Sequence, residues 1–90
     1  MAISKTGKYY VTMTDKFMSG WGKAQSKINK LVIECDNLQE AEIVYRNACN
    51  RDEMKYVNIL AEKPHYNAAR YYVSWADKTD YSAWFKPNAF

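Results

Sequence analysis

The stretch KLVIECDNLQEAEIVYRNACN, residues 30–50, decides the fold, because a two-residue hydrophobic alternation changes there into a helical one. In residues 30–36 the side chains of Leu31, Ile33 and Cys35 share one face, as in a half-buried strand. From residue 37 to about residue 50 apolar residues recur at three- and four-residue intervals, which predicts an amphipathic helix. The stretch therefore predicts a strand followed directly by a helix that lies on the sheet.

The expected helix has a capping signal and two distinct faces. Asp36 is the expected N-cap, and Gln39 stands three residues later, as in a capping box. The packing face is expected to consist of Leu38, Ala41, Tyr45, Ala48 and Cys49. The solvent face is expected to carry Glu40, Arg46 and Asn47.

Aromatic and β-branched residues mark three further strands, at residues 8–14, 55–62 and 70–75. Two of the three glycines lie in residues 19–29, which predicts a loop and an antiparallel hairpin. Residues 79–85 are expected to form one or two helical turns. The expected fold is a single α+β domain over residues 1–90. It is a two-layer sandwich of an antiparallel four-stranded sheet and one main helix, in the order β-β-α-β-β, with a short C-terminal helix.

Composition limits the class of protein. The chain has 90 residues, of which 48% are hydrophobic, and a formal net charge of +3. This length suits one compact domain, and the apolar content argues against disorder. No run of residues is apolar enough to span a bilayer, and the first residues lack the hydrophobic core of a signal peptide. We therefore expect a soluble, cytoplasmic protein.

The residues that carry catalytic chemistry are few. Cys35, Cys49 and His65 are the only cysteines and histidine, and they lack the number and spacing of a zinc site. Both cysteines are expected to be small buried hydrophobic residues, although a Cys–His nucleophile pair is formally possible. Phosphate-binding loops and the nucleophile and metalloprotease motifs are absent from the sequence. We expect no enzyme activity, no cofactor and no metal.

Charge is distributed unevenly along the chain. Residues 1–30 contain six lysines and one aspartate, whereas residues 31–62 contain three basic and seven acidic residues. Residues 63–90 contain four basic and two acidic residues. Such a distribution places opposite potentials on different sides of a small domain, which steers partners. The alternative is that the lysines have no binding role and lie on exposed strand faces, where they keep the protein soluble.

Aromatic residues are unusually abundant, with eight tyrosines, three tryptophans and three phenylalanines. One helix-covered face cannot hide all of them, and tyrosine or tryptophan beside a cation forms interface anchors or base-stacking platforms. The alternative is that the C-terminal residues Tyr81, Trp84 and Phe85 cover the open face of the sheet as a lid. The candidate partner-binding residues are Tyr10, Trp21, Lys23, Lys27, Lys30, Arg70 and Tyr72.

Four segments resemble a group of small proteins encoded by phages and prophages: residues 8–22, 29–36, 54–59 and 80–87. The resemblance extends over about residues 8–90 and carries no catalytic or cofactor residue. It implies a small phage accessory protein that acts inside a bacterial cell. Many proteins of this kind act by stoichiometric binding, and anti-CRISPR proteins, which inhibit host defence, are among them.

Three functions remain open on the sequence alone. The leading hypothesis is a non-enzymatic inhibitor that binds a host defence complex, which can itself carry nucleic acid. The first alternative is an accessory protein that binds single-stranded nucleic acid through a basic, aromatic face. The second is a homodimeric phage structural component that pairs through an open sheet face or edge.

Overall fold

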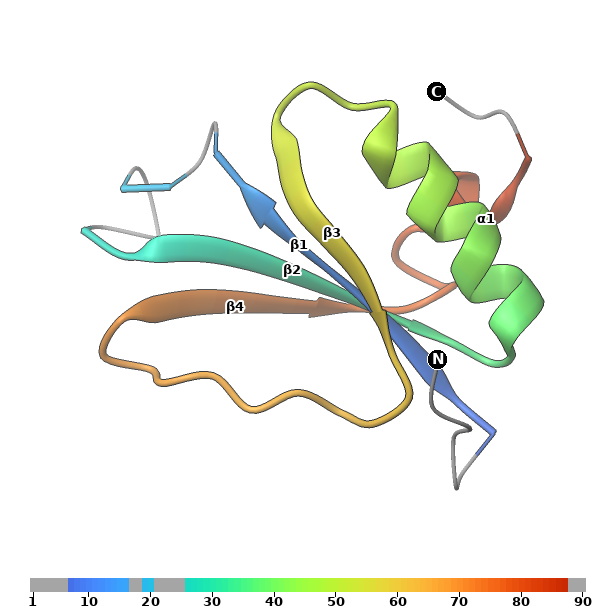
Figure 1. The fold of residues 1–90 in the computed structure, drawn as a ribbon, viewed down its shortest axis with the longest axis horizontal. Coiled ribbons are helices and arrows are strands. Elements are labelled where there is room, and N and C mark those ends of the chain that lie inside the picture. The colour runs from blue at the N-terminus through green and yellow to red at the C-terminus, as the bar shows by residue number, and fades with distance from the viewer. Residues whose placement is uncertain (1–6, 17–18, 21–25, 88–90) are drawn as a thin grey trace.

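The structure is a computed structural model that describes residues 7–16, 19–20 and 26–87. Its elements follow one another in the expected order along the chain (Figure 1). They are β1 (Tyr9–Asp15), β2 (Ile28–Cys35), α1 (Leu38–Cys49), β3 (Met54–Leu60), β4 (Tyr71–Ala76) and the 3-10 helix η2 (Ser82–Phe85). The α+β class, with one main helix and four strands, is confirmed. Of the expected loop over residues 19–29, residues 21–25 lie outside the described residues, and the last two residues belong to β2.

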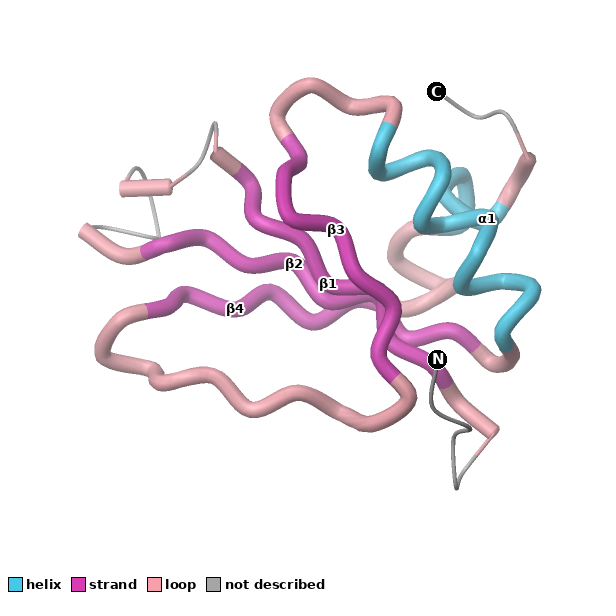
Figure 2. The backbone as a smooth tube through the Cα atoms, viewed as in Figure 1, coloured by secondary structure: helices cyan, strands magenta, loops and turns pink. Residues whose placement is uncertain are grey.

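The four strands form one mixed sheet in the order β3-β1-β2-β4. β1 pairs antiparallel with β2 and β3, whereas β2 pairs parallel with β4. The prediction of a fully antiparallel sheet is therefore wrong. The reason is the connection over residues 61–70, which leads from β3 at one edge to β4 at the other and returns along the length of the sheet (Figure 2). Because the connection brings the chain back to the end of the sheet where β3 began, β4 runs in the same direction as β3 and pairs parallel with β2.

Helix α1 connects β2 to β3, and these two parallel strands have β1 between them, as in a split β-α-β unit. The helix begins one residue later than expected. Asn37, not Asp36, is the N-cap, because the Asn37 side chain accepts a hydrogen bond from the Glu40 backbone N–H at 2.8 Å. Glu40 completes the cap by accepting a hydrogen bond from the Asp36 backbone N–H at 3.1 Å.

The main core lies between α1 and the sheet. Its strand residues follow the predicted alternation, so that Val11 and Met13 of β1 face the helix together with Ile33 of β2. Small side chains at Ala41 and Ala48 line the buried side of the helix. The buried members of this core are Val11, Met13, Leu31, Ile33, Cys35, Ala41, Val44, Ala48, Met54 and Trp84.

The second face of the sheet is also covered. Thr12, Thr14 and Val32 point away from α1 by strand alternation, yet all three are buried. The 61–70 connection crosses this face: its Lys63 ammonium lies 5.0 Å from the centre of the Trp75 ring, and its Tyr66 ring lies 5.4 Å from that of Tyr71. The connection therefore forms a third, irregular layer beside the sheet.

The C-terminal segment lies on the helix side, so the alternative that it covers the open face as a lid is wrong. Trp84 belongs to the helix-side core, and Tyr81 and Phe85 pack against it. Figure 1 shows the red C-terminal segment behind α1. The segment cannot reach the second face because η2 is fixed to the flank of the helix.

Asn47 of α1 fixes the C-terminal segment. Its side-chain amide donates to the Trp84 carbonyl at 2.7 Å and to the Lys86 carbonyl at 2.9 Å. Asn47 is only 1% exposed, although the sequence pattern predicts it on the solvent face. Conversely, Tyr45 and Cys49, expected on the packing face, are exposed. The helix is turned toward the C-terminal segment, which supplies the carbonyl groups that a buried amide requires.

Replacing Asn47 by alanine is expected to lower the free energy of unfolding by about 1–3 kcal/mol, because two carbonyl groups then lose their donor. Asn47→Asp should be at least as destabilising, since a carboxylate cannot donate to a carbonyl oxygen. Urea denaturation followed by circular dichroism measures both values. Glu42→Ala, on the exposed side of α1, is the control and should change stability by no more than about 0.5 kcal/mol. Equal stability of all three variants would contradict the role of Asn47.

Candidate functional site

Cationic side chains gather at one end of the sheet, where β1 finishes and β2, β3 and β4 begin. The pairing registers bring this about, because Thr14 lies opposite both Lys30 and Lys55, and Ile28 lies opposite Tyr71. We call this region the basic end, defined by Lys16, Lys27, Lys30, Lys55 and Arg70. Within the described part of the chain, none of these five side chains forms an ion pair with a carboxylate.

Lys30 has the most distinctive surroundings. Its ammonium donates to Thr14 Oγ1 at 2.6 Å and lies 5.9 Å and 5.8 Å from the ring centres of Tyr66 and Tyr71. Burial lowers the pKa of this ammonium below its usual value. A hydroxyl and two rings orient the charge but do not neutralise it. The site can therefore accept an anion.

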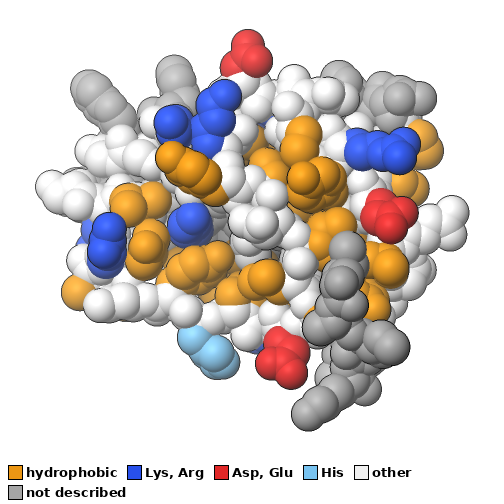
Figure 3. Space-filling model, viewed as in Figure 1, with side chains coloured by type: hydrophobic (Ala, Val, Ile, Leu, Met, Phe, Trp, Pro, Cys, Tyr) orange, Lys and Arg blue, Asp and Glu red, His pale blue; other side chains and the backbone are white. Residues whose placement is uncertain are grey.

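Further cations of the basic end also face aromatic rings. The Arg70 guanidinium lies 5.6 Å from the centre of the Tyr71 ring, and the Lys16 ammonium lies 5.7 Å from that of Tyr56. Figure 3 shows basic and hydrophobic side chains interspersed on the half of the molecule away from α1, with acidic side chains toward the margins. This pattern combines positive charge with stacking surfaces.

Tyr56 is held outward by a strained backbone. The register between β1 and β3 shifts between Thr12 and Thr14, so that β3 contains a bulge at this point. Tyr56 lies in the bulge with φ of 55°, a left-handed conformation that bulky side chains rarely adopt. Its side chain is 69% exposed. Strain of this kind is found preferentially at binding and catalytic sites.

Two lysines at the opposite end of the sheet have carboxylate partners. Lys8 contacts Glu34 and Asp36, and Lys78 contacts Asp36 and Glu40. The hydrogen bonds from Lys78 and Lys8 hold the pKa of Asp36 below its usual value. Hydrogen bonds to Glu40 and Asp36 raise the pKa of Lys78. Lys8 and Lys78 thus have counter-ions, whereas the described residues supply none to the five cations of the basic end.

Three of the candidate binding residues from the sequence, Lys27, Lys30 and Arg70, meet at the basic end. Trp21 and Lys23 lie outside the described residues. Tyr10 was expected to point outward, but it is buried beside Lys63 and Trp75 under the 61–70 connection. Tyr72 is half-buried on the opposite face of β4 from Tyr71.

Sequence reasoning missed five residues of this region: Lys16, Lys55, Tyr56, Tyr66 and Tyr71. Two of the tyrosines follow a basic residue directly, in the pairs Lys55-Tyr56 and Arg70-Tyr71. That repeated pair is a signal that could have found them. Tyr66 carries no comparable signal, because only the path of the connection brings it to Lys30.

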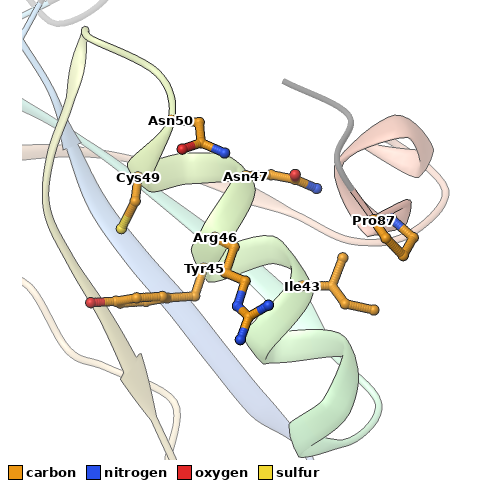
Figure 4. Close-up of a pocket in the computed structure, with 7 residues that line it drawn as sticks. All are labelled: Ile43, Tyr45, Arg46, Asn47, Cys49, Asn50 and Pro87. Atoms are coloured by element: carbon orange, nitrogen blue, oxygen red, sulfur yellow. The ribbon is translucent and has the colours of Figure 1, made fainter.

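The two cysteines differ in exposure. Cys35 is buried, as expected, and burial raises the pKa of its thiol to about 12. Cys49 is exposed, which contradicts the prediction, and it is among the residues of α1 that, with Pro87, line a pocket of about 330 Å³; its side chain points away from Pro87 (Figure 4). In the described segments neither thiol forms a hydrogen bond with His65. The formal Cys–His pair is therefore not assembled in this structure.

The described residues contain no group of three His, Cys, Asp or Glu side chains that could hold a metal ion. Nor do they include a helix of the length and apolar character needed to cross a membrane. Comparison of the chain with protein-family models, curated proteins and solved structures finds no match.

The thiols should react differently in the native protein. With iodoacetamide at pH 8 we expect one adduct per chain, at Cys49, because Cys35 is buried and protonated at that pH. Intact-mass and peptide mass spectrometry locate the adduct, and denaturant should add a second at Cys35. Cys49→Ser is the control and should give no native adduct. Rapid native labelling of Cys35 would restore the nucleophile hypothesis.

Tyr56→Gly should leave the free energy of unfolding unchanged or raise it by up to about 1 kcal/mol. Glycine adopts positive φ without a steric penalty, and the exposed tyrosine ring contributes little packing. Lys55→Gly, one residue earlier in ordinary strand backbone, is the matched control and should lower stability by about 0.5–1 kcal/mol. Urea denaturation measures both. A large loss of stability in Tyr56→Gly would show that the ring has a packing role.

Proposed function

We propose that the protein is a non-enzymatic binding protein whose basic end captures a negatively charged macromolecular complex in stoichiometric amounts. In the setting that the phage-protein resemblance implies, the complex is a host defence complex and the protein is its inhibitor, in the manner of anti-CRISPR proteins. The observation that carries the proposal is the position of Lys30, a half-buried cation held against Thr14, Tyr66 and Tyr71 with no carboxylate contact among the described residues.

An energetic reason supports a binding role for this cation. Burial disfavours the charged form of Lys30, and its neutral neighbours recover only part of the lost hydration. An anionic partner would recover more, because a hydrogen bond between charged groups is about twice as strong as one between neutral groups. Lys8 and Lys78, at the opposite end of the sheet, already have carboxylate partners that offset their loss of hydration.

The charge distribution also supports a defined orientation on the partner. The net charge of +3 is modest, so that general attraction to polyanions is limited. The five cations of the basic end lie together with no carboxylate partner among the described residues, whereas Lys8 and Lys78 contact Glu34, Asp36 and Glu40. An anionic surface would therefore approach the basic end first, and complementary potentials increase the association rate.

The test is a comparative pull-down of tagged protein from bacterial lysate, with and without nuclease. The basic-end variant carries Lys16→Gln, Lys30→Gln and Arg70→Gln, and the control, which removes two positive charges at the opposite end, carries Lys8→Gln and Lys78→Gln. We expect the wild type and the control to retain the same discrete complex. The basic-end variant should retain about one tenth as much or less, since three contacts of about 0.5–1 kcal/mol each are lost.

Equal retention by all three proteins would overturn the proposal, because the basic end would then have no part in capture. Failure of the wild type to retain any complex would overturn it as well. Thermal denaturation of each variant, with a melting temperature within about 5 °C of the wild type, shows that the comparison is between folded proteins.

A further inference from the structure

We infer that the basic end binds single-stranded nucleic acid, with Lys30 and Arg70 contacting phosphate groups and Tyr56 providing a stacking surface for a base. This inference rests on the proposed function and names the component of the captured complex that the protein touches.

The first step is the arrangement of the contacts in space. The strand order β3-β1-β2-β4 places Tyr56, Lys16, Lys30 and Arg70 in a row across the end of the sheet. Neighbouring strands are about 4.8 Å apart, so the row extends over roughly 14 Å. A stacked strand of about four nucleotides has this length, because each nucleotide occupies about 3.4 Å. The row thus fits a linear polyanion.

The second step is the geometry of the phosphate contacts. Lys30 and Arg70 both lie near the Tyr71 ring, at 5.8 Å and 5.6 Å from its centre. The hydrogen bond to Thr14 orients the Lys30 ammonium before any ligand arrives. Two cations that lie close to one aromatic ring are placed to contact neighbouring phosphate groups of one strand.

The third step is the exposed ring of Tyr56. The bulge in β3 turns this side chain outward, and Lys16 lies over it at 5.7 Å. An acidic protein surface would satisfy the cations, but it gives no reason for the strained, outward aromatic ring of Tyr56 beside Lys16. A nucleic-acid strand satisfies both, because its charge and its flat bases alternate along its length. Single strands are favoured over duplexes because their bases are free to stack.

The experiment is fluorescence anisotropy with labelled (dT)15 and (rU)15, in 20 to 200 mM NaCl. Wild-type protein should bind, and its affinity should fall with salt as phosphate contacts release counter-ions. Lys30→Gln should weaken binding about five-fold or more and flatten the slope of log affinity against log salt by about 0.7, the value for one phosphate contact on a single strand. Lys8→Gln, a variant of equal charge change, should leave affinity and slope near wild type.

Tyr56→Gly gives an independent signature. It removes a ring and no charge, so it should weaken binding about five-fold or more while leaving the salt slope unchanged. A labelled heparin fragment carries charge without bases and should bind Tyr56→Gly and wild type equally. Loss of heparin binding together with oligonucleotide binding would overturn the stacking role. Identical oligonucleotide affinities for wild type, Lys30→Gln and Tyr56→Gly would overturn the whole inference.

The inference and the proposed function can fail separately. If the oligonucleotides produce no anisotropy change at 50 mM NaCl, but the pull-down retains a complex that survives nuclease, the inference is wrong and the partner surface is an acidic protein. If the pull-down retains nothing and the oligonucleotides do not bind, both are wrong. If the oligonucleotides bind with the expected variant effects, the inference stands whatever protein accompanies the strand.

Discussion

The contact between Tyr66 and Tyr71, with ring centres 5.4 Å apart, holds the 61–70 connection against the sheet. The chain must pass from β3 at one edge to β4 at the other, and no regular element covers this passage. The connection lies on the second face, where polar strand residues such as Thr12 are buried. It also encloses the ammonium of Lys30 between two rings. The mixed sheet, the second buried face and the basic end therefore have one common cause.

The basic end combines features that would be costly in a purely structural region. A buried cation loses hydration, and a tyrosine in left-handed backbone carries steric strain of about 1–2 kcal/mol. Neither feature is required by the helix-side core, where side chains are apolar and adopt ordinary backbone. Both destabilising features lie at the same end of the sheet as the exposed ring of Tyr56 and the cations that have no counter-ion among the described residues. A ligand that neutralises the charge and covers the ring offsets their cost.

Local pattern was sufficient to place the strands and the helix, because periodicity and turn residues act over a few neighbours. Local pattern did not predict the burial or orientation of residues whose surroundings are supplied by a segment distant in the sequence. The buried Asn47 depends on the carbonyl groups of Trp84 and Lys86, almost forty residues away. Tyr71, not Tyr72, faces Lys30, because pairing with β2 fixes which face of β4 each residue occupies. In the site, Lys30 and Arg70 were found from charge alone, whereas Tyr66 could be found only from the path of the connection.

The bulge at Tyr56 has a consequence for association between copies of the chain. A strand from a second copy can pair regularly with an edge strand only where that edge offers an uninterrupted row of backbone N–H and C=O groups. The bulge interrupts this row in the edge strand β3. β4, at the other edge, pairs in continuous register with β2. A sheet with one regular edge can join a second copy through that edge, and the pair then presents only bulged edges. If copies of the chain were to join by strand addition, the distortion that turns an aromatic ring outward would thus oppose extension beyond two chains.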